Sequence, residues 1–332
     1  FNNPPAKAQE IISAGDVPLG TQGNLFGITG GEGTGKSNYV AAIVAGCICP
    51  AGADIDTLGI QITANGRHKA VLLYDTEQSE VQLFKNVSNL LARAKQPDKP
   101  DELKAFCLTG MSRKERLNAI VQSMDKFYYQ YGGIQLVVID GIADLVKSAN
   151  DEAESVAVID ELYRLAGIYN TCILCVLHFV PNGLKLRGHL GSELQRKAAT
   201  ILSIEKDEEP TQSVVKALKV RDGSPLDVPL MLFAWDKEAG MHVYKGEKPR
   251  EEKEKRKERE LVNVARDIFG RQTRITYIDL CEQLQQVLDI KERTAKSYIR
   301  FMRERDIITK DTANQSCFVI GSYNLQRNAS CP

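Results

Sequence analysis

The sequence predicts an α/β protein in which helices flank a mostly parallel central sheet, followed by a small C-terminal domain. Two observations lead to this fold class. Continuous apolar segments of strand length alternate with helical segments through most of the chain, which is typical of a parallel sheet covered on both faces. A highly charged stretch then interrupts this pattern near Lys248, and a compact helical pattern follows it. At 332 residues the chain has room for both domains.

The elements of the first domain can be assigned in order. We expect a lead-in over residues 1–23, with a short helix at Ala6–Ile12 and a turn at Val17–Gly20. A buried strand over Asn24–Thr29 precedes a glycine-rich loop and a helix from Ser37 to Cys47. Further strands are predicted at 58–62, 69–74, 103–108, 134–139, 172–177, 200–205, 213–220 and 230–235, and helices at 79–94, 112–131, 151–169 and 192–199.

The glycine-rich loop reads GGEGTGKS and fits the pattern G-x-x-x-x-G-K-[ST], which binds the phosphates of a nucleoside triphosphate. The glycines let backbone N–H groups turn toward anionic oxygens, because no Cβ stands in the way. Lys36 would place its charge on the β- and γ-phosphates, and the Ser37 hydroxyl would coordinate Mg²⁺. We therefore expect ATP and Mg²⁺ as ligands. The expected nucleotide-binding residues are Gly30, Gly31, Glu32, Gly33, Thr34, Gly35, Lys36, Ser37 and Asn38.

Two acidic residues follow later apolar strands. Asp140 ends the run that begins at Ile134, and Glu77 follows the strand at 69–74. Ligand sites of open α/β sheets lie beyond the carboxyl ends of the strands, so both carboxylates are expected beside the phosphates. Asp140 would hold Mg²⁺ through water, and Glu77 would polarise the attacking water. The alternatives are a turn-forming aspartate and a glutamate that begins a helix.

The segments Leu25–Ser37, Leu72–Glu77 and Leu136–Leu145 resemble, in this order, the core of RecA-like P-loop ATPases. The resemblance extends over roughly residues 15–240. It implies a catalytic glutamate on the strand between the two nucleotide motifs, a position that Glu77 matches. The AAA-type arrangement places that glutamate next to the second motif, where this chain has Gly141.

Three further segments resemble hexameric helicases. His178 matches the polar residue at a strand end that senses the γ-phosphate. Leu186–Ser192 resembles the R-G-S stretch after the DNA-facing loop of plasmid RepA-type helicases, and Lys219–Gly223 resembles the K-x-R-x-G hairpin of DnaB-type helicases. The likeness to DnaB-type helicases implies that Lys219 and Arg221, on a hairpin at the sheet's edge, complete the site of a neighbouring subunit in a homo-oligomer such as a hexamer. A structural histidine and solvated strand residues are the alternatives.

The chain is expected to divide into an ATPase domain at 1–245, a charged linker at 246–259 and a third segment at 260–332. The third segment has the order helix, short strand, helix, helix and hairpin, which is typical of a winged helix-turn-helix. Its predicted elements are the helices 261–269, 277–288 and 292–305 and the strands 274–276, 307–310 and 316–320, with Thr276 capping the second helix.

DNA is the expected macromolecular partner. Single-stranded DNA would run through the ATPase ring, and duplex DNA would receive the third helix of the C-terminal domain in its major groove. That domain also carries an excess of basic over acidic residues. Contact with another protein is the alternative use of the same basic face. The expected DNA-binding residues are Lys185 and Arg187 in the first domain and Lys291, Arg293, Lys296 and Arg300 in the second.

Cysteine use and hydropathy predict a cytoplasmic protein without a membrane segment. Several of the eight cysteines lie in apolar runs, as expected for reduced thiols. Cys172 and Cys175 could suggest a redox or zinc pair, but on a strand their side chains would point to opposite faces, so core packing is the interpretation. No apolar run approaches the roughly 20 residues that span a bilayer, and no signal-peptide pattern begins the chain.

These observations predict a Mg²⁺-ATP-hydrolysing motor that acts on DNA, similar to the helicases with which plasmids and mobile elements replicate or transfer. Two other classes stay open. One is a recombinase-type filament or ATP-switched loader without unwinding activity. The other is a DNA-binding regulator in which the ATPase core acts as a switch.

Overall fold

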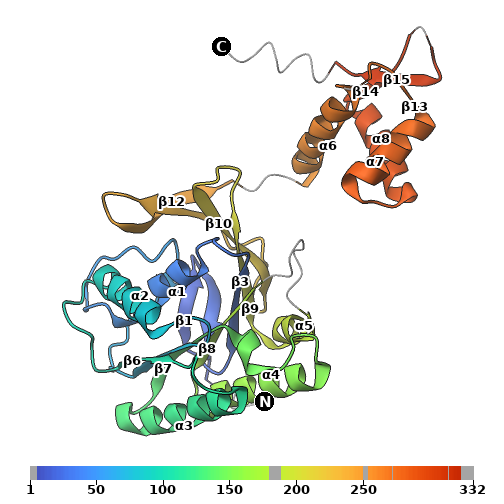
Figure 1. Ribbon diagram of the computed structural model, residues 1–332. Helices are drawn as coiled ribbons and strands as arrows, with labels where there is room; N and C mark the ends of the chain where they lie inside the picture. Colours follow the sequence, from blue (N-terminus) through green and yellow to red (C-terminus); the bar gives the residue numbers. More distant parts are fainter. Residues whose placement is uncertain (1–5, 179–187, 250–252, 271, 313, 323–332) are drawn as a thin grey trace. The chain divides into compact units, whose positions relative to one another are not determined.

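The computed structural model describes residues 6–178, 188–249, 253–270, 272–312 and 314–322. The chain forms two compact units, Phe1–Lys248 and Pro249–Pro332 (Figure 1). Across the part of the chain that is described, no helix combines the length and apolar character needed to cross a membrane.

A large sheet forms the centre of the first unit. Nine of the described strands lie in the order β12-β11-β10-β9-β3-β8-β7-β5-β6. The strands from β9 to β6 in this order run parallel, whereas β9, β10, β11 and β12 pair antiparallel. The predicted fold class, an α/β protein with a mostly parallel sheet, is confirmed. The bounds are β3 Leu25–Gly30, β5 Ala70–Asp75, β6 Leu103–Cys107, β7 Ile134–Asp140, β8 Cys172–His178, β9 Thr200–Lys206, β10 Gln212–Val220, β11 Leu230–Asp236 and β12 Met241–Lys248.

Helices cover both faces of this sheet (Figure 1). Helices α1 and α2 pack into one hydrophobic core, in which Ile43 and Leu90 lie against the sheet. Helices α3, α4 and α5 pack into the other core, through residues such as Leu162. Strands buried on both faces need apolar side chains at every position, which is why β3 and β5 read as unbroken apolar runs. The bounds are α1 Lys36–Ile48, α2 Glu80–Arg93, α3 Arg113–Tyr131, a 3₁₀ turn Ile142–Leu145, α4 Glu152–Ile168 and α5 Gly188–Lys197.

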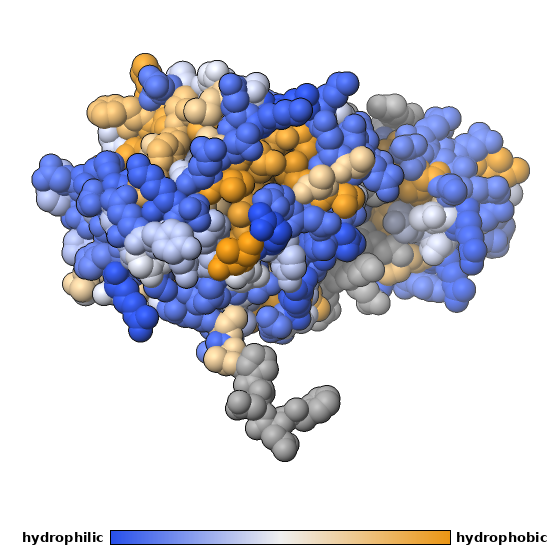
Figure 2. All heavy atoms as spheres, turned by 90° about the horizontal axis from the view of Figure 1, so that it is seen from below, coloured by the Kyte–Doolittle hydropathy of each residue, from blue (hydrophilic) through white to orange (hydrophobic). Residues whose placement is uncertain are grey.

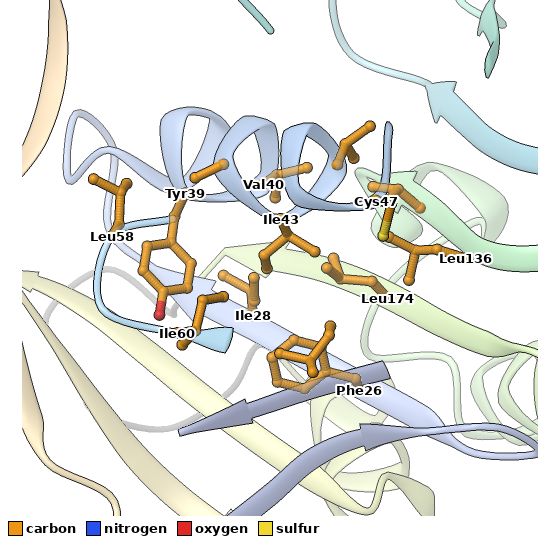
Figure 3. Packing of buried hydrophobic residues seen from close by; sticks show 14 of the residues in the cluster. Phe26, Ile28, Tyr39, Val40, Ile43, Cys47, Leu58, Ile60, Leu136 and Leu174 are labelled. Atoms are coloured by element: carbon orange, nitrogen blue, oxygen red, sulfur yellow. The ribbon is translucent and has the colours of Figure 1, made fainter. Parts of the chain in front are cut away.

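Local signals set the ends of several helices. The Ser112 hydroxyl and the Glu115 carboxylate form a capping box at the start of α3, and Gly132 ends that helix in a left-handed conformation with φ 65°. Asp151 Oδ1 accepts the Glu154 N–H at 3.0 Å at the start of α4. Figure 3 shows how α1 presents Tyr39, Val40 and Ile43 to the apolar strand residues beneath it.

The predicted lead-in is wrong. Instead of a helix at Ala6–Ile12, the chain forms β1 Glu10–Ala14 and β2 Val17–Thr21, which make a small antiparallel sheet with β4 Gln61–Ile62. Ile11 and Ile12 are both fully buried. The physical reason is that neighbouring apolar residues on a strand can be buried on both sides, here within the core that contains α1.

The cysteine interpretation agrees with the packing. Cys172 belongs to the core on one side of the sheet and Cys175 to the core on the other side. Both are free thiols, and burial raises the pKa of Cys175 to about 12.

The outer surface is mostly hydrophilic when the molecule is seen from below, with hydrophobic residues gathered in the middle of that face (Figure 2).

The second unit has its own hydrophobic core, which includes Leu261, Leu284 and Ile299. Three helices and a small antiparallel sheet in the order β13-β15-β14 make up its described part. Thr276 Oγ1 accepts the Asp279 N–H at 3.3 Å and so caps α7, as predicted. The bounds are α6 Lys253–Phe269, β13 Ile275–Thr276, α7 Tyr277–Leu288, α8 Glu292–Glu304, β14 Ile308–Lys310 and β15 Cys317–Ile320.

The stretch expected as a linker, 246–259, contains regular structure at both ends. Strand β12 continues to Lys248, and α6 begins at Lys253. The division between the units therefore falls at Lys248–Pro249. Strand β12 itself had no counterpart among the predicted strands, because its polar and aromatic residues lack the apolar run of the other strands.

Candidate active site

The glycine-rich loop joins β3 to α1 and is built by backbone geometry. Gly33 and Gly35 adopt left-handed conformations, with φ 67° and 92°. A Cβ on Gly30 would lie 2.3 Å from the Ile204 carbonyl oxygen, so the loop can lie against β9 only with glycine there. The helix begins at Lys36, which places its N-terminal N–H groups at the loop. This combination suits the binding of an anion such as phosphate.

Lys36 is held at the loop by the loop's own backbone. Its Nζ donates to the carbonyl oxygens of Gly30 at 3.1 Å and Gly31 at 2.6 Å, and the residue is only 7% exposed. Burial lowers the pKa of the ammonium, while the charges of Asp140 and Glu77 act in the opposite direction. The hydrogen bonds of Lys36 to carbonyl oxygens can be exchanged for stronger, charge-assisted bonds to phosphate oxygens.

The sheet register brings the polar strand ends to one edge. Asp75 at the end of β5 is paired with Asp140 at the end of β7, and Gly30 at the end of β3 is paired with His178 at the end of β8. His178 Nε2 lies 3.2 Å from Glu77 Oε2. The strands are parallel neighbours, so their carboxyl ends meet here, as expected for a ligand site of an open α/β sheet.

A pocket of about 310 Å³ lies at this edge. It brings together most of the sequence-predicted nucleotide residues with both predicted carboxylates and the predicted sensor. Gly30, Gly31 and Thr34 complete the loop without lining the pocket; the Thr34 hydroxyl donates to the Gly31 carbonyl at 2.9 Å. The lining residues are Glu32, Gly33, Gly35, Lys36, Ser37, Asn38, Glu77, Gln78, Asp140, His178 and His242.

Hydrogen bonds fix the position of Glu77. Asp75 Oδ1 accepts from the backbone N–H groups of Glu77 at 3.0 Å and Gln78 at 2.8 Å. Thr76 Oγ1 donates to the carbonyl oxygen of Gly141 at 2.8 Å, which ties this loop to the end of β7. Gly141 has φ 100°, and a Cβ there would lie 2.3 Å from Thr76 Oγ1. Only glycine at position 141 therefore lets the two loops meet.

Asp140 is electrostatically unfavourable as a carboxylate. Burial, and next the negative charges of Asp75 and Glu77, raise its pKa to about 7, against the opposing effect of Lys36 and His178. Burial also raises the pKa of Asp75, which is 2% exposed. A divalent cation would relieve this crowding of like charges.

The donors at this edge fit Mg²⁺. The carboxylate of Asp140 and the hydroxyl of Ser37 are both hard oxygen ligands, which Mg²⁺ prefers. In the described part of the chain, no group of three or more His, Cys, Asp or Glu side chains is placed to hold a metal ion. Mg²⁺ commonly takes one or two protein ligands and completes its shell with substrate phosphates and water.

Lys219 and Arg221 lie outside this pocket. Lys219 Nζ donates to three carbonyl oxygens at the C-terminal end of α5, at 2.7–3.1 Å, and Arg221 Nη2 donates to the Lys197 carbonyl at 2.9 Å. Cations at a helix C-terminus satisfy carbonyls that lack partners. The expectation of an edge hairpin is wrong, because β11 and β12 lie beyond β10 in the sheet.

The expected DNA contacts fall in two places. Lys185 and Arg187 lie outside the described residues. On α8, the predicted inward residues Ala295, Ile299 and Met302 are buried, as expected. The basic residues Lys291, Arg293, Lys296 and Arg300 are exposed. Lys296 pairs with Glu292 at 2.7 Å, and Arg300 with Glu304 at 2.8 Å.

Sequence reasoning missed three residues of the site. Asp75 and Gln78 flank Glu77, so their place beside a strand end was available as a signal. His242 lines the pocket from β12, more than 200 residues after the glycine-rich loop, and no motif in the sequence points to it. Strand pairing places it there.

A comparison with protein-family models identifies the class to which this chain belongs. A search of curated proteins finds no match to the chain. A family model described as an AAA domain matches residues 1–182, which is more than half of the chain and spans the glycine-rich loop, Glu77, Asp140 and His178. Nucleotide binding, usually with Mg²⁺, is general to this class. The chain belongs to the AAA-domain family of P-loop ATPases, with a RecA-like core.

Proposed function

We propose that this ATPase works on DNA as a helicase-like motor, which serves replication, mobilisation or recombination of a mobile element or plasmid. The observation that carries the proposal is the convergence of Lys36, Glu77 and Asp140 on one pocket at the carboxyl edge of the sheet. Hydrolysis of a triphosphate requires these three kinds of group: a phosphate-binding cation, a carboxylate that positions water, and a carboxylate beside the metal.

Each group has a distinct role in this proposal. Lys36 leaves the carbonyl oxygens of its loop and neutralises charge on the transferred phosphoryl group. Glu77 accepts a hydrogen bond from the attacking water and orients it. Mg²⁺, when bound near Ser37 and Asp140, supplies further charge neutralisation. The contact between His178 and Glu77 gives a route by which the γ-phosphate acts on the carboxylate: a histidine drawn to the phosphate releases Glu77 to the water.

Assembly into a homo-oligomer is the second part of the proposal. Val81 and Phe84 lie one turn apart on α2 and are 81% and 76% exposed, so they offer an apolar surface to a second copy. In a ring such as a hexamer, Arg221 and Lys219 would exchange the carbonyl oxygens of α5 for a neighbour's phosphates. Hydrolysis would then depend on assembly.

Binding to duplex DNA by the second unit is the third part. The order of its helices and strands is the one expected of a winged helix, in which α8 would be the recognition helix. A hollow of about 610 Å³ lies between α8 and β14, and its lining includes Arg300, Arg303 and Lys310. Three cationic side chains around one hollow suit a phosphate backbone. The remaining lining residues are Glu304, Ile308 and Thr309.

Steady-state ATP hydrolysis by the full chain, with and without single-stranded DNA, tests the proposal. We expect stimulation by DNA and loss of turnover in Arg221→Ala and Glu77→Gln. A mixture of these two variants should recover part of the activity, because a site formed between Glu77 of one variant and Arg221 of the other is intact. No recovery in mixed oligomers would contradict a site shared between subunits.

Two other functions are separated by further measurements. ATP-dependent separation of a forked duplex distinguishes a helicase from a recombinase-type filament or loader, which would hydrolyse ATP without unwinding. A regulator is favoured by one observation, the independent core of the second unit. It predicts tight, sequence-specific duplex binding by the full chain and no stimulation of hydrolysis by DNA.

A further inference from the structure

The hairpin of β11 and β12 presents four aromatic side chains on one face. Trp235 pairs directly with His242, and Phe233 pairs with Tyr244. Residues two apart on a strand share a face, so Phe233 and Trp235 lie on the same side as their partners. The His242 ring meets Phe233 edge-on at 5.6 Å between centroids and Trp235 edge-on at 5.5 Å.

This hairpin is anchored beside the glycine-rich loop. A Cβ on Gly35 would lie 2.8 Å from the Phe233 ring, so Phe233 packs directly under the last residue of the loop. The rings of Phe233 and Tyr39 lie 5.8 Å apart, which joins the hairpin to α1. Asp56 Oδ2 accepts the Tyr244 N–H at 2.7 Å. These contacts hold β12 at the rim of the pocket.

A buried arginine holds the His242 backbone as well. Arg93, on α2, is 6% exposed and donates through Nη2 to the His242 carbonyl and through Nη1 to the Asp56 carbonyl at 2.8 Å. The backbone at His242 and at Tyr244 is therefore fixed by groups from α2 and from the loop after α1. The ring is placed at the pocket before any ligand enters, which reduces the entropic cost of binding.

The state of the imidazole argues against a phosphate-binding role. Burial, and next the positive charges of Arg93 and Lys206, lower the pKa of His242 and so favour the neutral ring. Within the described residues, its buried Nδ1 has no hydrogen-bond partner. A neutral ring backed by Trp235 and Phe233 offers a flat aromatic surface and a polar edge, which match a nucleobase.

We propose that His242, backed by Trp235, forms the nucleobase-facing wall of the pocket, so that the β11–β12 hairpin binds the nucleoside while the glycine-rich loop binds the phosphates. The inference rests on the proposed binding of ATP. It adds that two separate segments bind the two parts of the nucleotide: the glycine-rich loop binds the triphosphate, and the distant hairpin binds the base.

Trp235 makes this division measurable, because it is the chain's only tryptophan. We expect Mg²⁺-ATP to change the tryptophan emission of the full chain, whereas Mg²⁺-tripolyphosphate, which has no base, binds without that change. Calorimetry measures the affinity for both ligands independently of the fluorescence. Binding of tripolyphosphate with an equal emission change would overturn the proposal.

Substitution at His242 gives the sharper test. His242→Ala should weaken ATP binding about tenfold, as expected for the loss of one stacked base contact, and change tripolyphosphate affinity less than about twofold. His242→Phe should restore ATP affinity, because it keeps the aromatic surface. His68→Ala is the matched control, since His68 is an exposed histidine paired with Glu102 and does not line the pocket.

The outcomes separate this inference from the proposed function. Retained tripolyphosphate affinity in His242→Ala shows that the variant is folded. An equal loss for both ligands would assign His242 to the phosphates, and unchanged ATP affinity would remove it from the site; either result overturns the inference and leaves ATP binding intact. If the wild-type chain binds neither ligand, the proposed function fails and the inference fails with it.

Discussion

The charged side chains of the two units differ in what surrounds them. In the first unit, Lys36 is buried against carbonyl oxygens, and Asp140 shares its surroundings with Asp75 and Glu77. In the second unit, Lys296 and Arg300 are exposed, and each pairs with a glutamate one helical turn away. Both units have basic residues where a ligand is expected, but only the charged groups of the first unit are held in an electrostatically unfavourable state.

This difference separates a built site from an available surface. Burial of like charges costs free energy that a ligand of opposite charge can recover. Exposed pairs at helical spacing contribute only a few tenths of a kcal/mol and are common on soluble helices. The electrostatics of the ATPase pocket therefore indicate the class of its ligand. For the basic face of α8, only binding measurements can identify a ligand. The following predictions test this contrast in order of decreasing effect.

Removal of the buried cation should have the largest effect. We expect Lys36→Ala to lower ATP hydrolysis by at least about 100-fold, because it removes the ammonium that the carbonyl oxygens of the loop hold beside the pocket. Steady-state turnover of the full chain measures it. Lys296→Ala, which removes an exposed lysine of α8, is the control and should retain near-normal hydrolysis in the absence of DNA. An equal loss of ATP turnover in both variants would contradict the distinction between the two units.

Glu77→Gln should separate binding from chemistry. The amide keeps the size of the side chain but cannot act as a base, so we expect turnover to fall on the order of 100-fold. Affinity for Mg²⁺-ATP should stay within about twofold, because Glu77 is expected to contact water rather than phosphate. Turnover and calorimetry on the same preparation decide this. A matching fall in affinity would instead indicate that Glu77 holds the metal.

Gly141→Ala should destabilise the first unit by about 1–3 kcal/mol, because φ 100° is strained for alanine and its Cβ would meet Thr76 Oγ1. Chemical denaturation followed by circular dichroism measures the free energy of unfolding. Gly66→Ala is the matched control, since no atom lies within 4 Å of its Cβ position. Similar stabilities for the two variants would show that the loops at Thr76 and Gly141 can separate without cost.

Asp140→Asn should stabilise the nucleotide-free protein at pH 8 by on the order of 1 kcal/mol while impairing Mg²⁺-dependent hydrolysis. The folded-state pKa of about 7 lies above the ordinary value of 3.8 for an aspartic acid. The native state therefore binds more protons than the unfolded state between these values, and stability rises as the pH falls through 7. The gain from Asn should shrink toward pH 5.

Thermal unfolding at several pH values measures this difference. Asp16→Asn, at an exposed position, is the control and should show no comparable pH dependence. A stabilisation by Asp140→Asn that is independent of pH would mean that the carboxylate is not held at a raised pKa.

The smallest effects are expected on α8. Arg300→Ala should change the free energy of unfolding by less than about 0.5 kcal/mol, because its pair with Glu304 is exposed. If α8 binds duplex DNA, the slope of log affinity against log salt should fall by about 1 for each phosphate contact removed. Fluorescence anisotropy with labelled duplex measures it. An unchanged slope for Arg300→Ala and Lys296→Ala would favour the protein-contact alternative for this face.

The nucleotide half of the site could be predicted because its signals are local. The strand, the glycine-rich loop and the helix that begins at Lys36 follow one another in the chain, and their chemistry depends on neighbouring backbone groups. Asp140 and Glu77 could be placed by a general rule, since parallel strands end at the same edge of a sheet. Helices α7 and α8 agree closely with their predicted bounds, because caps such as Thr276 and the 3.6-residue period are also local, whereas α6 begins at Lys253, before its predicted start at 261.

The N-terminal hairpin and β12 show where such reasoning ends. The strand around Ile12 forms by pairing with β2 and also with β4, which follows α1 in the chain. Strand β12 carries few apolar residues and forms by pairing with β11. Each element becomes a strand through its pairing partners, so the composition of its own residues does not contain the information.

By itself, then, the amino-acid sequence determined the phosphate-binding loop, the two strand-end carboxylates and the division into two units. Only the tertiary structure decided that His178 contacts Glu77, that Lys219 and Arg221 bond to the end of α5, and that His242 lines the same pocket. The physical reason is that hydrogen bonds between adjacent strands bring distant residues together, and the resulting burial sets their charge and position.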